Sequence, residues 1–147
     1  MNRRELLLGV AGLAAAATAG SVFADEVHAG HEHHHGMSMR NDSLIDAATD
    51  CQLKASICLQ HCIVSLGQGE KELAACAQSA SQVIAMCAAL QQMAAAQSKY
   101  LPQLAKVAMS VCKDCEEECK KTQKHPECKA CMDACVACYK ECQKIAA

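Results

Sequence analysis

Thirteen cysteines in a chain of 147 residues are the side chains best able to do chemistry here. Eight of them form two runs with steps of three and four residues: Cys112, Cys115 and Cys119, then Cys128, Cys131, Cys135, Cys138 and Cys142. The other five are Cys51, Cys58, Cys62, Cys76 and Cys87. Steps of three and four keep side chains on one face of a helix. The pattern predicts a stripe of thiols where a helix bundle normally carries leucine, and such a stripe favours a soft metal ion.

Disulfide pairing along this stripe is disfavoured by its spacing. Residues three or four apart on a helix have Cβ atoms ~5–6 Å apart, whereas a disulfide needs ~3.8 Å. Thirteen is also odd, so full pairing within the chain leaves one thiol over. Pairs between helices remain open at this point.

Four helices are predicted to carry the thiols, over residues 42–66, 70–96, 99–122 and 126–145. Gly67-Gln68-Gly69 ends the first helix, Pro102 suits the first turn of the third, and His125-Pro126 separates the last two. Charged residues alternate with the cysteines on the last two helices, which marks the solvent face. Short connections predict an all-α fold, an antiparallel up-down-up-down four-helix bundle with a cysteine-lined core.

Antiparallel packing divides the predicted core by height. The end with the first and third connections collects thiols, namely Cys58, Cys62, Cys76, Cys115, Cys119, Cys128 and Cys131. The opposite end collects Leu44, Leu90, Leu101, Leu104 and Ile145, with Val111 among the core positions of the third helix. Cysteines 128–142 alone extend over about 21 Å at ~1.5 Å per residue. The sequence therefore predicts a column of sulfur closed at one end by leucine.

The N-terminal part has a different character. Residues 1–24 resemble an export signal, with Arg3-Arg4 before an apolar run and small residues at its end, which favours the twin-arginine route over an ordinary secretory signal. Residues 25–41, which hold His28, His31, His33, His34 and His35, are expected to be a disordered segment, and residues 42–147 the bundle domain. We therefore expect an exported, periplasmic protein, and folding before export would shelter the thiols from oxidation.

Charge and hydropathy exclude some partners. The formal net charge of −2 gives no electrostatic case for nucleic acid or anionic lipid. Past the leader, no second apolar run is long enough to predict a membrane span. We expect neither nucleic acid nor membrane as a partner of the mature form.

Several copper(I) ions are the predicted cargo. Ligand softness favours Cu(I), with zinc, cadmium and iron–sulfur clusters behind it. One Cu(I) for each thiol proton keeps a closed core neutral, whereas Zn(II) held by four thiolates leaves two buried negative charges at each site. Two alternatives stay open: a zinc- or cadmium-binding protein, and a thiol redox protein that uses Cys-x-x-Cys pairs such as Cys112/Cys115.

Other side chains are candidates for lesser roles. His61 lies between Cys58 and Cys62 and can share their face, so it is a candidate ligand or gate at the thiol-rich end. His125 is expected to be mainly a turn residue. Met86, Met93, Met109 and Met132 fall beside the core stripes, where packing is the expected role. The histidine tract could capture copper from outside or simply aid solubility.

The chain resembles the bacterial copper storage proteins in its Cys58-Leu59-Gln60-His61-Cys62 and Cys138-Tyr139-Lys140-Glu141-Cys142 segments, its cysteine-dense helices and its leader. The resemblance implies a non-catalytic, exported protein whose thirteen cysteines bind Cu(I), with His61 at the mouth of the bundle. It also implies a homotetramer of bundles and a role in copper supply to other proteins.

Overall fold

The computed structural model describes residues 41–147. Over that range the chain forms the helices α1 (Asp42–Gly67), α2 (Ala74–Ala95), α3 (Leu101–Lys121) and α4 (Pro126–Ala146). A single 3-10 turn, η2 (Lys71–Leu73), precedes α2. The predicted export signal and most of the predicted histidine-rich segment lie outside the described residues.

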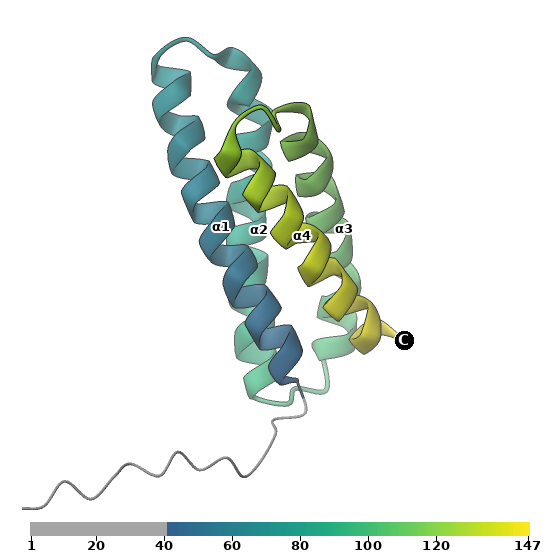
Figure 1. Ribbon diagram of the computed structural model, residues 1–147. Helices are drawn as coiled ribbons and strands as arrows, with labels where there is room; N and C mark the ends of the chain where they lie inside the picture. The colour runs from purple at the N-terminus through teal and green to yellow at the C-terminus, as the bar shows by residue number, and fades with distance from the viewer. Residues whose placement is uncertain (1–40) are drawn as a thin grey trace, which may run out of the picture. The chain divides into compact units, whose positions relative to one another are not determined.

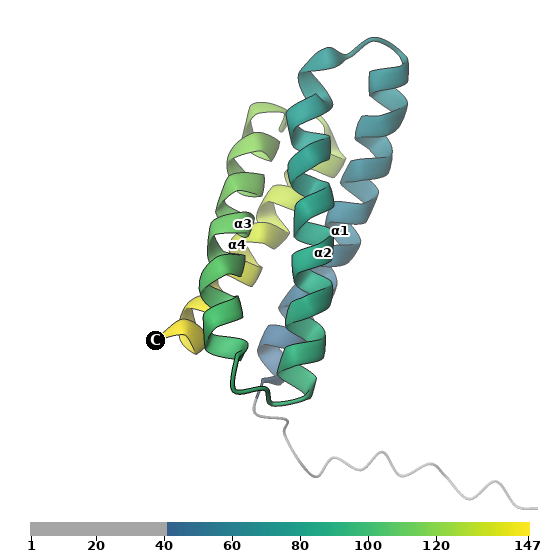
Figure 2. The same cartoon turned by 180° about the vertical axis from the view of Figure 1, so that it is seen from behind.

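The helices run up, down, up and down, and each packs against its two neighbours in the cyclic order α1, α2, α3, α4 (Figure 1). Figure 2 shows the same bundle from behind, with α2 and α3 in front. The α1–α2 and α3–α4 connections lie at one end, and the α2–α3 connection and the C-terminus lie at the other. The expected all-α, up-down-up-down four-helix bundle is confirmed.

The connections follow from a few residues. Gly69 has φ +99°, a conformation that a residue with a side chain adopts only with strain, so the turn after α1 depends on this glycine. Pro126 occupies the first turn of α4, where its missing N–H is not needed. The predicted helix bounds differ from the observed ones by at most two residues, except that the second helix begins with η2.

The core consists of small side chains in contact along the bundle axis. Its non-cysteine members are Leu44, Ala48, Ala55, Leu73, Ala80, Val83, Leu90, Ala94, Leu101, Ala105, Ala108 and Ala134. Three predicted core residues, Leu104, Val111 and Ile145, are only partly buried. Ala105 and Ala134, which the spacing did not single out, are also buried, at 0% and 5% exposed.

Leucine closes the end that holds the α2–α3 connection. Leu44, Leu90 and Leu101 are between 0% and 4% exposed there. Asn41 Nδ2 donates a hydrogen bond of 3.1 Å to the carbonyl oxygen of Ala94, which ties the start of α1 to the end of α2. Three members of the predicted leucine plug are therefore buried, whereas Leu104 and Ile145 are only partly buried.

Contrary to the expectation from the sequence, one helical segment, Lys71–Ala95, is long and apolar enough to pass a length-and-composition test for a membrane span. Core helices of soluble proteins pass the same test. One face of this segment, including Cys76, Val83 and Leu90, is buried within the bundle.

Candidate metal centre

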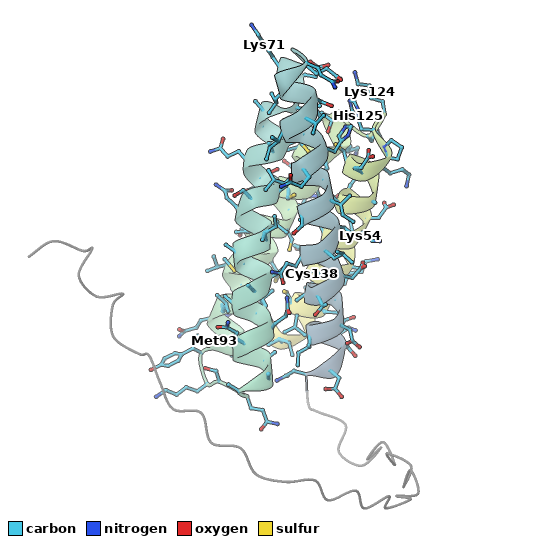
Figure 3. All side chains as sticks on the ribbon, turned by 90° about the vertical axis from the view of Figure 1, so that its left-hand side faces the viewer. Lys54, Lys71, Met93, Lys124, His125 and Cys138 are labelled. Atoms are coloured by element: carbon cyan, nitrogen blue, oxygen red, sulfur yellow. The ribbon has the colours of Figure 1, made fainter. Side chains whose placement is uncertain are left out.

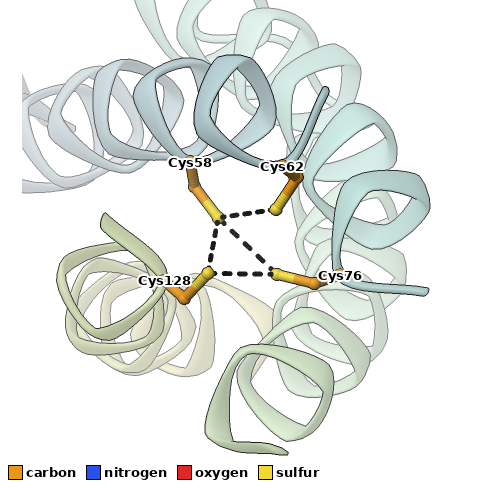
Figure 4. Close-up of side chains that lie close together, drawn as sticks. All are labelled: Cys58, Cys62, Cys76 and Cys128. Atoms are coloured by element: carbon orange, nitrogen blue, oxygen red, sulfur yellow. Dashed lines mark hydrogen bonds between the residues drawn. The ribbon is translucent and has the colours of Figure 1, made fainter. Parts of the chain in front are cut away.

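Four cysteine sulfurs meet near the two connections at the upper end of Figure 1. Cys58 Sγ lies 4.0 Å from Cys62 Sγ, 3.6 Å from Cys76 Sγ and 3.7 Å from Cys128 Sγ. Cys76 Sγ and Cys128 Sγ are 3.8 Å apart (Figure 4). Three different helices supply these thiols, so only the assembled bundle brings them together.

Sulfur contacts continue from this group toward the leucine end. Cys76 Sγ lies 3.5 Å from Cys119 Sγ, and Cys115 Sγ lies 3.9 Å from Cys119 Sγ and 3.8 Å from Cys131 Sγ. Further groups of sulfurs within 4.8 Å of one another are Cys115, Cys131 and Cys135, and Cys51, Cys112 and Cys138. Cys51 Sγ and Cys135 Sγ, 3.8 Å apart, join these two groups. We call the thirteen cysteines together the thiol column.

Water is excluded from the whole thiol column. Each of the thirteen cysteines is 0% or 1% exposed. All thirteen are free thiols, because the closest sulfurs are 3.5 Å apart and a disulfide bond is ~2.05 Å long. The structure therefore holds many reduced thiols in one dry, connected space.

Ionisation of these thiols is uneven along the column. Burial raises the pKa of the Cys128 thiol to about 12. Burial, followed by repulsion from Cys58, also raises the pKa of Cys62 above its usual range. Hydrogen bonds donated by neighbouring thiols lower the pKa of Cys58; Cys119 has the largest effect and Cys131 the next largest.

The same lowering recurs deeper in the column. Donation by Cys119 and then Cys131 lowers the pKa of Cys115, and donation by Cys112 and then Cys142 lowers the pKa of Cys138. Three thiols at different heights are thus the easiest to deprotonate, because neighbouring S–H groups stabilise their negative charge. Each is a place where a metal cation can first displace a proton.

Two histidines cover the thiol-rich end. His61 on α1 has a side chain that is 24% exposed, and His125, which immediately precedes α4, has one that is 15% exposed. His61 Nε2 lies 3.0 Å from His125 Nδ1. Figure 3 places His125 beside Lys124, at the same end of the bundle as Lys71. His61 therefore lies at the mouth of the thiol column and is half-buried.

Sequence reasoning singled out His61 and the thirteen cysteines, and the structure places the cysteines in one column with His61 beside its upper end. The sequence analysis gave His125 mainly a turn role. It did not single out Glu70 or Glu127, although these carboxylates contact the two histidines. The closeness of His125 and Glu127 to Cys128 in the sequence was a signal that could have identified these two residues. The four candidate methionines, Met86, Met93, Met109 and Met132, pack partly buried against the core.

Fold and site together define a helix bundle whose core is a metal-binding thiol array. The match to a family model, "Csp: Copper storage protein", covers residues 37–147. The chain therefore belongs to the copper storage protein family.

Solved structures share the fold. The chain is similar to apo-Csp3, copper storage protein 3 from Bacillus subtilis, with a TM-score of 0.65 and 24% sequence identity over 73% of this chain and 99% of that one. It is equally similar to a Cu(I)-bound copper storage protein, BsCsp3, with a TM-score of 0.65 and 24% identity over 73% and 98% of the two chains. No curated protein sequence matches the chain.

Proposed function

We propose that this chain is an exported storage protein without a catalytic cycle that holds many Cu(I) ions, about one for each cysteine. The continuity of the thiol column carries this proposal. Sulfurs 3.5–4.0 Å apart can share a metal ion at about 2.3 Å from each, with a sulfur–metal–sulfur angle of roughly 100–120°. The Cu(I)-bound structure of BsCsp3, which has the same fold, supports Cu(I) as the cargo.

Charge balance favours Cu(I) over Zn(II) or cadmium. Among residues 41–147 the buried polar side chains are Asn41, Ser65, Ser79 and Thr122, and none of these is a cation. A site of four thiolates and one divalent ion therefore leaves two negative charges in the core with no positive side chain to offset them. One Cu(I) for each thiolate leaves no net charge.

Copper movement along the column follows from the short sulfur separations. An ion bound by Cys58 and Cys62 can form a bond to Cys76 before it releases Cys62, because Cys58 and Cys76 are 3.6 Å apart. The same step repeats through Cys119, Cys115 and Cys131. We infer that His61 receives Cu(I) first and passes it to the upper thiols, so that no bare ion is needed inside the bundle.

The N-terminal leader bears on where the protein is located, and the surface of α1 bears on its oligomeric state. Arg3-Arg4 and the apolar run after it support export to the periplasm through the twin-arginine route. Leu53, Ile57 and Val64 are 46–59% exposed, and their spacing places them on one face of α1. An apolar face of this kind supports a homo-oligomer, and the family resemblance suggests a tetramer that supplies copper to other proteins or confers copper tolerance.

The rival function is thiol redox chemistry with Cys-x-x-Cys pairs. A redox enzyme needs a thiol that a substrate can reach. Cys112, Cys115, Cys128 and Cys131 are at most 1% exposed, which argues against contact with a disulfide substrate.

A competition titration tests the proposal. Reduced, oxygen-free protein is titrated with Cu(I) against a chelator, and bound ions and released protons are counted. About one ion and one proton for each cysteine, with much weaker binding of zinc by the thiols, is the expected result. Saturation at one to three ions would contradict storage and favour a shuttle or redox role.

A matched variant shows where the copper resides. Replacing all thirteen cysteines with Ala, with circular dichroism to confirm the helices, should abolish almost all loading. Full loading of that variant would assign the copper to the N-terminal histidine tract instead.

A further inference from the structure

The mouth of the bundle carries a second group of donors that contains no sulfur. We call His61, His125, Glu70 and Glu127 the His–Glu cluster. His61 Nε2 and His125 Nδ1 face each other at 3.0 Å. The other ring nitrogen of each histidine, which we call the outer nitrogen, faces a carboxylate. His61 Nδ1 lies 3.6 Å from Glu127 Oε2, and His125 Nε2 lies 3.5 Å from Glu70 Oε2.

Counting protons shows that two neutral imidazoles cannot satisfy this arrangement. They carry two N–H groups, and the contact between the rings uses one of them. Only one outer nitrogen then has a proton to donate, so the other turns a lone pair toward a carboxylate. His125 Nε2 and Glu127 Oε2 are in fact buried atoms without a hydrogen-bond partner among the described residues. Buried polar atoms of this kind require a compensating group.

A metal ion between the rings removes the conflict. With an ion on His61 Nε2 and His125 Nδ1, both ring protons move to the outer nitrogens and each faces its own carboxylate. Histidine ligands commonly donate the other ring N–H to a carboxylate in this way, which fixes the tautomer and ring orientation.

The spacing of the inner nitrogens fits a shared ion. Two nitrogens bound at about 2.0–2.1 Å with an angle of roughly 90–110° lie about 2.9–3.4 Å apart. The observed separation is 3.0 Å. A linear two-nitrogen arrangement needs roughly 4 Å at the same bond length, so the cluster suits an ion with bent coordination.

We propose that His61 Nε2 and His125 Nδ1 bind one divalent ion of borderline softness, such as Zn(II), oriented by Glu127 and Glu70. Imidazole suits Zn, Ni and Cu(II), and the part-exposed side chains leave room for water to complete the coordination. Such an ion links α1 to the connection before α4 and therefore closes the mouth of the thiol column. The site is distinct from the thiol column, because its donors are nitrogen and oxygen, and it shares only His61 with the proposed entry of Cu(I).

Zinc titration followed by ring-nitrogen NMR tests the site directly. The protein is the reduced full-length chain with the five tract histidines, His28, His31, His33, His34 and His35, replaced by Asn, which removes a competing zinc site. We expect the resonances of His61 Nε2 and His125 Nδ1 to shift together on saturation of one site, with the outer nitrogens protonated. The assignment by nitrogen separates this site from zinc bound by thiols.

Variants add a second readout. His125→Ala should abolish the zinc response of His61, and Glu70→Gln should weaken zinc binding at the histidines about 10–100-fold. Glu117→Gln is the matched control, because Glu117 is 60% exposed on α3 and pairs with Lys113, and it should leave binding unchanged.

Two results would overturn the proposal. Unchanged ring nitrogens at zinc saturation would mean that an extra proton, not a metal, fills the gap between the rings. A shift of His61 that persists in His125→Ala would place His61 in a thiol site. Neither result bears on Cu(I) storage, which is measured separately.

Discussion

Cys76 Sγ on α2 and Cys119 Sγ on α3 lie 3.5 Å apart, the shortest sulfur–sulfur contact in the thiol column. The pair connects the four thiols of the mouth with the column below it, because Cys119 also contacts Cys115. An ion that leaves the mouth for the deeper thiols has its shortest step here.

Loss of this pair should interrupt filling. The double variant Cys76→Ala/Cys119→Ala is expected to bind about two fewer Cu(I) ions and to load the deeper thiols more slowly, with helix content retained. Stopped-flow loading and the final copper count measure both effects. Ser56→Ala is the control, since Ser56 is partly buried on α1 and its hydroxyl donates to the carbonyl oxygen of Gln52. Equal loss of copper in the control would refute a specific role for the sulfur pair.

Alkaline pH should destabilise the apo protein. Unfolded thiols ionise near their ordinary pKa of 9.0, whereas burial holds the pKa of Cys128 at about 12. Because the folded state keeps a proton that the unfolded state releases, the free energy of unfolding falls as pH rises through this window, by about 1.4 kcal/mol per pH unit for one such thiol. Urea denaturation at several pH values measures the slope.

The copper-loaded protein provides the comparison for that slope. Its thiol protons have been displaced, so its stability should depend much less on pH above 9.0. The variant with thirteen alanines corrects for lysine and tyrosine ionisation. A slope that this variant shares with the apo protein would exclude the thiols as its cause.

Copper loading should raise the melting temperature strongly. The ions bind thiols that meet only in the folded bundle, so binding free energy adds to folding free energy, by about 4 kcal/mol when free ligand is a thousand times the dissociation constant. Scanning calorimetry before and after treatment with a Cu(I) chelator measures the gain and its reversal. A loaded protein that melts with the apo protein would show that copper binds outside the core.

The leucine end should control stability without affecting capacity. Leu90 is 0% exposed, so Leu90→Ala is expected to cost about 2–5 kcal/mol of unfolding free energy. Leu53→Ala is the control, with the same chemical change at a side chain that is 55% exposed, and its effect on the monomer should be about 0.5 kcal/mol or less. Copper capacity should be the same in both variants. A reduced capacity in Leu90→Ala would mean that this end also takes part in storage.

The apolar face of α1 predicts self-association. Ile57→Lys places a charge on a residue that is 46% exposed, between Leu53 and Val64 on the same face. We expect a smaller assembly by analytical ultracentrifugation with the helix content unchanged. Lys substitution at Gln82, an exposed position on α2, is the control and should leave the assembly intact.

Most of the fold was predictable because its signals are local. The three-four spacing of the cysteines, the Gly67–Gly69 turn and the His125-Pro126 break locate the helix ends within two residues, except at the start of the second helix, where the 3-10 turn η2 precedes α2. Their cysteines also identify the buried face, since a thiol stripe on a helix has no reason to face water. The partial burial of Leu104 and Ile145 was not predictable, because it depends on how closely neighbouring helices approach.

Taken alone, the sequence determined the four helices, the face that each buries and the soft chemistry of that face, since periodicity and residue type act within one helix. Tertiary structure decided which thiols from different helices touch, such as Cys58 with Cys128 at 3.7 Å. It also brought His61 within 3.0 Å of His125, and each histidine to a carboxylate, across 64 residues of chain. Those contacts depend on the register between helices, which side-chain packing sets and spacing along one helix does not encode.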